Sequence, residues 1–121
     1  MNEAALKCKC GCGLDVTQET KDKLRRIEGR LGMELIYTSG ARCAAHNSKV
    51  SATGDDGPHT YQVAADIACK GAMARDVIGA AIAEGMTGIG ISQKGPHEKR
   101  FVHIDLMEDR PGHPRPWVWT Y

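Results

Sequence analysis

Two stretches of sequence decide how this chain folds and what it can bind: His59-Thr-Tyr-Gln-Val-Ala-Ala-Asp66 and, later, Phe101-Val-His-Ile-Asp105. The first sets a histidine and a carboxylate seven residues apart, and the second places another histidine, His103, inside an apolar run. Two imidazoles and one carboxylate are the ligand set of a catalytic zinc site, whose fourth tetrahedral position stays open for water. A structural zinc site would use four protein ligands, usually including thiolates. The pattern therefore predicts a hydrolytic metal site.

The two stretches also have the character of β-strands with apolar neighbours. A carboxylate at Asp66 is costly to bury without a cation or hydrogen bonds, and His103 stands between two apolar residues. Because residues two apart in a strand point to the same face, His103 and Asp105 share one face. We expect Asp105 to orient the His103 imidazole or to serve as the general base. A buried His–Asp pair without metal is the alternative.

Patterns elsewhere predict an α+β domain that spans residues 1–121. Thr17 is the expected N-cap of a helix that ends near Leu31, before Gly32. Further helices are expected over 41–50 and 72–83, and strands over 34–38, 62–68, 88–92 and 101–106. These elements do not alternate in βα units long enough for a parallel sheet, so we expect a small antiparallel sheet with helices packed on one face. The tail has too many prolines for a helix, and its two tryptophans should fold back onto the body.

Composition limits the possible functions. The chain has 121 residues, with 16 basic and 15 acidic side chains and a formal net charge of +1. No strong field is available to hold nucleic acid or an anionic membrane, so we expect neither partner, and we expect a monomer. The N-terminus lacks the apolar region of a secretory signal, which predicts synthesis in the cytoplasm and, for work outside, another route of export.

The sequence does not determine the chemical state of the five cysteines. Cys8, Cys10 and Cys12 alternate with other residues, while Cys43 and Cys69 stand apart. This spacing differs from the Cys-x-x-Cys knuckle of most structural zinc sites. Reduced thiols in a turn of small residues are the simplest interpretation. A disulfide within the group or to Cys43, and a second metal site, are the alternatives.

Several motifs together resemble the zinc D-Ala-D-Ala carboxypeptidase family, which includes cell-wall peptidases of bacteria and phages and shares its fold with the Hedgehog signalling domain. The resemblance rests on Ser-Gly-Ala-Arg at 39–42, His-Asn at 46–47, the His59 to Asp66 stretch and the Phe101 to Asp105 stretch. The Cys-x-Cys-Gly-Cys-Gly motif at 8–13 and Arg-Pro-Trp-x-Trp at 115–119 also resemble small phage-encoded members.

The resemblance implies a function for each of these residues. His59, Asp66 and His103 would bind one zinc ion per chain. Arg42 would stabilise the developing oxyanion or hold a substrate carboxylate, tasks that suit its forked guanidinium. The implied substrate is the stem peptide of peptidoglycan, cut either at a terminal D-Ala or at an internal bond such as L-Ala-D-Glu.

The chain departs from the family pattern at three positions. Gly57 stands where the motif has Ser, Gln62 where it has Gly, and Arg100 where one branch has its catalytic Glu. The third departure leaves the general base open: Asp105 is our prediction, and Glu98 and His97 are its rivals. Two other classes of function also stay open, a zinc-containing peptide-binding module without catalysis and a non-metal interaction domain held by the cysteines.

Overall fold

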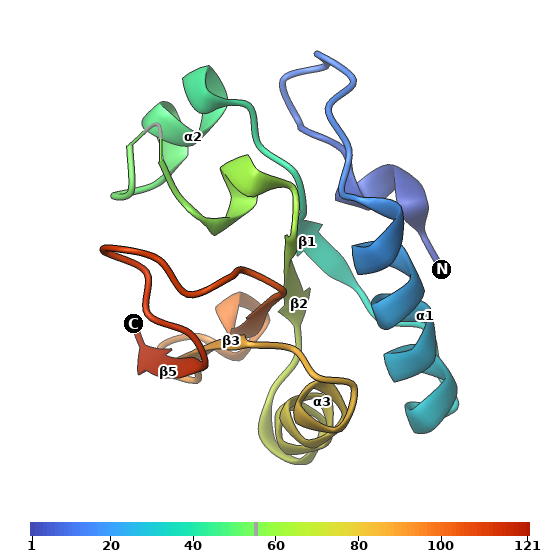
Figure 1. Cartoon of the computed structure of the whole chain (residues 1–121). Helices are drawn as coiled ribbons and strands as arrows, with labels where there is room; N and C mark the ends of the chain where they lie inside the picture. Colours follow the sequence, from blue (N-terminus) through green and yellow to red (C-terminus); the bar gives the residue numbers. More distant parts are fainter. Residues whose placement is uncertain (55) are drawn as a thin grey trace.

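The computed structural model, which describes residues 1–54 and 56–121, contains five strands. They are β1 (Tyr37–Ser39), β2 (Ala64–Ala68), β3 (Gly88–Ser92), β4 (Phe101–Asp105) and β5 (Trp117–Thr120). They form one open sheet in the order β1-β2-β4-β3-β5 (Figure 1). All neighbours are antiparallel except β3 and β5, which run parallel. The predicted α+β class with an antiparallel sheet is confirmed, and the parallel pair β3–β5 is the one departure among the described strands.

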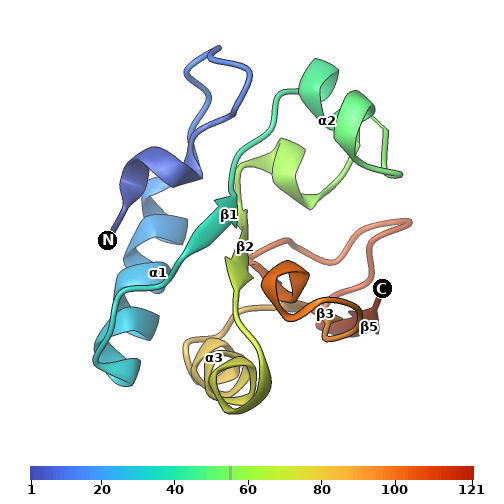
Figure 2. The ribbon, with the colours of Figure 1, turned by 180° about the vertical axis from the view of Figure 1, so that it is seen from behind.

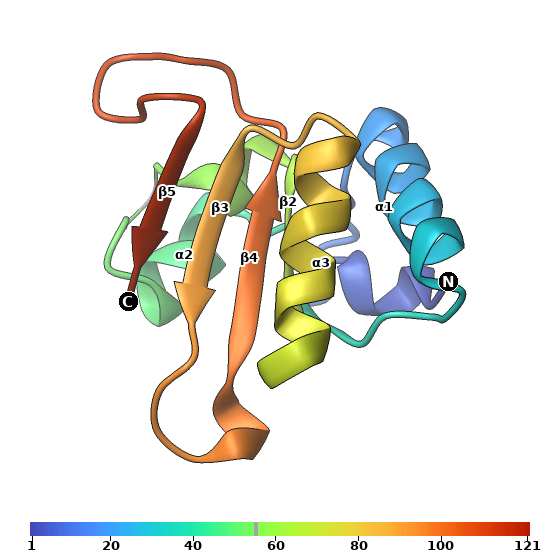
Figure 3. The ribbon, with the colours of Figure 1, turned by 90° about the horizontal axis from the view of Figure 1, so that it is seen from below.

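Three helices and three short 3₁₀ turns complete the fold. The helices are α1 (Gln18–Leu31), α2 (Ala44–Val50) and α3 (Gly71–Ala83), and the turns are η1 (Glu3–Leu6), η2 (Pro58–Tyr61) and η3 (His97–Lys99). The predicted packing on one face holds for the two long helices, α1 and α3, but not for α2, and Figure 2 shows the same arrangement from behind. The short α2 lies on the far side of the sheet from α3 (Figure 3). Within the described residues, no helix is long and apolar enough to cross a membrane.

The sequence signals at both ends of α1 act as predicted. The Thr17 side chain accepts a hydrogen bond from the Thr20 backbone N–H at 3.2 Å, which satisfies one of the unpaired donors of the first turn. Gly32 ends the helix in the left-handed conformation, with φ of +66°, which glycine adopts without strain. Between them, Leu24 and Ile27 are fully buried against the core.

The alternation of side chains in β2 and β4 separates the core from the opposite face. Ala65, Ile67, Val102 and Ile104 are fully buried in the cluster that the long helices cover. Their neighbours in sequence therefore point to the other face, where α2 and η2 lie. The polar residues of both strands are consequently gathered on one side of the sheet.

The first strand is shorter than predicted and begins later. The Glu28 carboxylate accepts hydrogen bonds from the Leu35 backbone N–H at 2.9 Å and from the Tyr37 hydroxyl at 3.1 Å. The backbone at Leu35 is thus bound to a side chain of α1, and pairing with β2 starts only at Tyr37. Two other elements also begin later than predicted. The strand expected over 62–68 starts at Ala64 as β2, and the helix expected over 41–50 starts at Ala44 as α2.

The tail forms a strand that sequence patterns did not predict. β5 lies parallel to β3, with Trp119 opposite Gly90. A Cβ atom at Gly90 would lie 2.7 Å from the Trp119 ring, so glycine makes room for the indole. The expectation that the tryptophans fold back is met by Trp119, whereas Trp117 is 55% exposed.

Candidate metal centre

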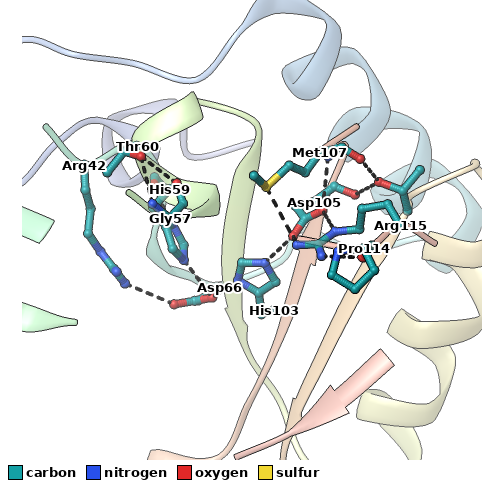
Figure 4. A network of polar contacts seen from close by, with 12 residues as sticks. Arg42, Gly57, His59, Thr60, Asp66, His103, Asp105, Met107, Pro114 and Arg115 are labelled. Atoms are coloured by element: carbon teal, nitrogen blue, oxygen red, sulfur yellow. Dashed lines mark hydrogen bonds and ion pairs between the residues drawn. The ribbon is translucent and has the colours of Figure 1, made fainter. Parts of the chain in front are cut away.

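The register of the sheet places the three predicted ligands together. Asp66 in β2 lies directly opposite His103 in β4, and His59 comes from η2 above them. The Asp66 Oδ1 atom is 3.0 Å from His103 Nδ1 and 3.3 Å from His59 Nε2 (Figure 4). One ligand atom from each residue lies within 4.8 Å of the others. We call His59, Asp66 and His103 the sheet cluster.

Each imidazole of the sheet cluster is held by its other nitrogen. His59 Nδ1 is 2.6 Å from the Gly40 carbonyl oxygen, which can only accept, so Nδ1 carries the proton and Nε2 is free to bind a metal. His103 Nε2 is 2.7 Å from Asp105 Oδ2, while Nδ1 faces Asp66. Metal-binding histidines characteristically donate their second N–H to a carbonyl or a carboxylate. The donor set and its supports therefore fit zinc.

The electrostatics of the sheet cluster favour an ionised carboxylate. Burial would raise the pKa of Asp66, but the neighbouring imidazoles, first His103 and then His59, outweigh it and hold that pKa well below its usual range. Burial would lower the pKa of His103, yet hydrogen bonds to Asp105 and Asp66 outweigh it and raise that pKa. Buried negative charge next to imidazoles is an environment in which a divalent cation can replace protons.

Asp105 shares the face of His103, as strand parity predicts, but it lies behind the imidazole. Its carboxylate is fully buried and accepts two hydrogen bonds from Arg115, from Nε at 3.0 Å and from Nη2 at 2.9 Å. The Met107 backbone N–H adds a third at 3.1 Å. The arrangement Arg115–Asp105–His103 fixes the ring from the side away from Asp66 (Figure 4). Arg115 was missed by sequence reasoning, because nothing in the tail indicates its partner.

Arg42 lies on the opposite side of the sheet cluster. Its Nε donates to Ser39 Oγ at 3.0 Å, and its Nη1 donates to Asn47 Oδ1 at 3.1 Å. Its Nη2 is 3.5 Å from Asp66 Oδ2. Two of the three guanidinium nitrogens are thus bound by the scaffold, and the third is directed at the ligands. The position beside the ligands is the one that the motif implied, and the role of Arg42 stays a prediction.

A cavity of about 430 Å³ opens above the sheet cluster. It is lined by Arg42, by the three ligands, by residues 50–53 with Pro58, and by the aromatic rings of Phe101, Trp119 and Tyr121. The Trp119 ring centroid is 5.1 Å from that of His103, so β5 supplies a wall of the cavity. In the described part of the chain, Asp66 is the only acid that lines it.

None of the three candidate bases lines this cavity. Asp105 is turned toward Arg115, and His97 and Glu98 line a separate hollow together with Arg100. The structure therefore brings together the predicted ligands and Arg42, but it does not bring the predicted proton carriers into the same space. The role of Asp105 as a base stays a prediction, and its geometry favours the orienting role.

Two departures from the family motif have local structural explanations. A Cβ atom at Gly57 would lie 2.9 Å from Thr53 Cβ, so the Thr53 side chain fills the space of a motif Ser side chain. Gln62 adopts the left-handed conformation, with φ of +64°, which explains why a motif would have Gly there. The Gln62 side-chain amide donates to the Asp15 backbone carbonyl at 2.8 Å, and the Gln62 backbone carbonyl accepts from the Thr17 N–H at 2.9 Å. These contacts offset the strain.

An open His-Asp-His donor set at the base of a cavity is typical of metal-dependent hydrolases. A family model described as peptidase M15 matches residues 1–105, and the chain therefore belongs to this family of zinc D-Ala-D-Ala carboxypeptidase-like enzymes. No curated protein and no solved structure matches the chain. The match includes the whole sheet cluster and Arg42, while Arg115 and Trp119 lie beyond its end.

Proposed function

We propose that this chain is a zinc-dependent peptidase that cleaves a peptide bond involving a D-amino acid in the peptidoglycan stem peptide. One observation carries the proposal: His59 Nε2, Asp66 Oδ1 and His103 Nδ1 converge below a cavity, while each imidazole has a protein partner for its other nitrogen. Membership in the M15 family supports the reaction class. When bound, zinc supplies a Lewis acid for the peptide carbonyl and makes water nucleophilic near neutral pH.

The residues around the ligands maintain their orientation. The Gly40 carbonyl holds the His59 ring, and the Asp105 carboxylate holds the His103 ring. Arg115 neutralises Asp105, which would otherwise be an uncompensated buried charge. We therefore assign Asp105 and Arg115 as positioning residues for His103.

Arg42 is placed to act on the substrate. With Nε and Nη1 bound to Ser39 and Asn47, the guanidinium is preorganised, and Nη2 faces the cavity beside Asp66. A donor fixed in this way can stabilise negative charge that develops on a carbonyl oxygen, or it can pair with a terminal carboxylate. Both tasks suit a peptidase that acts at or near a C-terminal D-Ala.

The cavity walls suit a peptide with small side chains. Aromatic rings from β4 and β5 form one wall, and the short polar stretch 51–53 forms another. An apolar wall can contact methyl groups such as those of alanine, while the polar stretch offers hydrogen bonds to a peptide backbone. The proposal covers both a carboxypeptidase and an endopeptidase, and the resemblance to small phage-encoded members supports a phage or prophage origin.

Turnover of defined peptides tests the proposal. The zinc-loaded protein should release D-Ala from a peptide that ends in D-Ala-D-Ala, or cut a stem peptide at L-Ala-D-Glu, as followed by mass spectrometry. Removal of zinc with a chelator should abolish the product, and added zinc should restore it. An all-L peptide of the same composition is the matched control. Equal cleavage of both peptides would contradict the assigned substrate class.

A zinc-containing peptide-binding module is the second candidate. It is favoured by Arg100 at the position of the catalytic Glu and by the single acid in the described part of the cavity lining. Such a module would bind the D-Ala-D-Ala peptide in a zinc-dependent manner, measurable by calorimetry, without releasing any product. Binding without turnover would therefore favour the module over the enzyme.

A further inference from the structure

Four of the five cysteines meet at one point, and none of them belongs to the sheet cluster. The Sγ atoms of Cys8, Cys10, Cys12 and Cys43 all lie within 4.8 Å of one another. Cys10 Sγ is 3.4 Å from Cys8 Sγ and 3.5 Å from Cys43 Sγ. Four thiolates around zinc, at Zn–S distances of about 2.3 Å, lie about 3.8 Å apart in a tetrahedron. The spacing of the sulfur atoms is close to this value and far from the roughly 2.05 Å of a disulfide bond.

A tight loop makes the unusual Cys-x-Cys-x-Cys spacing suitable for this convergence. The Cys8 N–H donates to the Leu14 carbonyl at 2.8 Å, and the Gly11 N–H donates to the Cys8 carbonyl at 3.3 Å. Gly11 and Gly13 take φ of +85° and +86°, a conformation that other residues rarely adopt. The loop consequently brings the Sγ atoms of Cys8, Cys10 and Cys12 close together.

Backbone N–H groups are directed at two of the sulfur atoms. The Cys43 N–H lies 3.3 Å from Cys8 Sγ, and the His46 N–H lies 3.4 Å from Cys43 Sγ at the start of α2. Burial raises the pKa of Cys8, but the backbone N–H groups of Cys10 and Cys43 outweigh it and lower that pKa to about 7. N–H donors of this kind stabilise the thiolate, which is the form that binds metals.

We infer that Cys8, Cys10, Cys12 and Cys43, the thiol cluster, form a structural site for a thiolate-binding divalent cation such as zinc. Four protein ligands close the coordination sphere, which is the mark of a structural site. The inference rests on the sulfur geometry and is independent of the proposed peptidase activity.

The position of the thiol cluster gives the metal a defined task. The Ala41 N–H already donates to the Leu6 carbonyl at 2.8 Å, which joins the N-terminal segment to the connection between β1 and α2 (Figure 1). Gly40 has no room for a side chain, because a Cβ atom there would overlap the Leu6 backbone. A metal bound by Cys43 and by the N-terminal cysteines would cross-link the same two segments at a second point, next to Arg42. The site would thereby fix the segment that supplies both Arg42 and the carbonyl that holds His59.

Zinc counting on matched variants of the whole chain tests the inference. The protein is purified with reductant, saturated with zinc and freed of loosely bound metal, and its zinc content is measured by elemental analysis. Two zinc ions per chain are expected for the two clusters. His59→Ala should lose one of them, and the double variant Cys10→Ser with Cys12→Ser should lose the other. Cys69→Ser, which changes a buried thiol outside the cluster, should lose neither.

The zinc that remains in the cysteine double variant shows that the chain is still folded, because the sheet cluster forms only when β4, which carries His103, is paired with β2, which carries Asp66. Substitution with cobalt gives a second readout, since cobalt bound to four thiolates has intense visible absorption that this double variant should lack.

Two results would overturn the inference. One is an unchanged zinc content in the cysteine double variant. The other is a wild-type protein whose cysteines are joined as disulfides, detected as fewer than five reactive thiols after denaturation without reductant. Failure of the peptidase proposal looks different, because it would leave the cysteine-dependent zinc in place and abolish only turnover.

Discussion

The sheet cluster and the thiol cluster are built in opposite ways. The sheet cluster uses nitrogen and oxygen atoms from residues that are buried on the sheet, and its ligands line a cavity. The thiol cluster uses sulfur atoms from the loop that holds Cys8, Cys10 and Cys12 and from Cys43 at the start of α2, and it offers four protein ligands. The difference teaches that one small chain can hold two candidate metal sites of different chemistry, one open to a cavity and one with four thiol ligands. Strand register creates the first cluster, and glycine turns create the second.

The largest expected effect comes from removal of a sheet-cluster ligand. His59→Ala should reduce peptide hydrolysis to background and release the zinc of this cluster, because an open site with two protein ligands holds zinc poorly. The thiol cluster should keep its metal. Elemental analysis and a peptide assay on the same sample measure both effects. His46→Ala, which changes a histidine outside both clusters, is the control. Retention of two zinc ions in His59→Ala would contradict the ligand assignment.

Arg42→Lys separates catalysis from metal binding at the sheet cluster. Lysine keeps the charge but loses the fork that contacts Ser39, Asn47 and Asp66. Turnover should fall by the equivalent of roughly 2–4 kcal/mol in the activation barrier, the usual cost of removing one positioned donor. Steady-state kinetics give this value, and zinc content should be unchanged. A kcat near that of the wild type would indicate that Arg42 is structural.

Asp105→Asn tests the positioning role in the sheet cluster. If the carboxylate orients His103, zinc affinity should fall by about 10–100-fold, while kcat at saturating zinc changes little. If Asp105 is instead the base, kcat should fall by about 10²–10⁴-fold at full zinc occupancy. Competition with a chelator measures the affinity. Glu98→Gln is the companion variant, and loss of turnover there alone would assign the base to the loop before β4.

The smallest expected effect concerns packing beneath the sheet cluster. A Cβ atom at Gly88 would overlap the Asp105 carboxylate. Gly88→Ala should therefore lower the free energy of unfolding by about 1–3 kcal/mol, as overpacking typically does. It should also weaken zinc binding by the sheet cluster alone. Gly79→Ala in α3, where nothing lies within 4 Å, should instead raise the free energy of unfolding by about 0.5–1 kcal/mol. Denaturant titrations measure the free energy of unfolding of both variants. Equal changes in Gly88→Ala and Gly79→Ala would contradict the overlap of a Gly88 side chain with Asp105.

Sequence patterns predicted the parts of the structure that depend on local rules. The caps of α1 follow from Thr17 and Gly32, and the shared face of His103 and Asp105 follows from the two-residue period of a strand. The convergence of the three ligands could be predicted from the sequence, because polar residues that are costly to bury require partners.

The features of the structure that the sequence did not predict depend on contacts between segments that are distant in sequence. The Glu28 carboxylate delays β1 by binding the Leu35 N–H, and no local pattern reveals this contact. The strand β5 follows a proline-rich stretch, and it forms because Gly90 leaves space for Trp119. The ion pair of Arg115 with Asp105 likewise appears only when the tail is in place. Sequence spacing alone also left the cysteines open, since their convergence needs two left-handed glycines.

The ion pair between Arg115 and Asp105 has a consequence for where this protein can be shortened. The family match ends at residue 105, yet the cation that neutralises Asp105 is ten residues further along. A chain trimmed to the matched region would keep every ligand and leave one buried carboxylate without its counter-charge, an omission that typically costs about 3–5 kcal/mol. It would also uncover the edge of β3, a template for association with other chains. The recognisable motif is therefore smaller than the unit that folds.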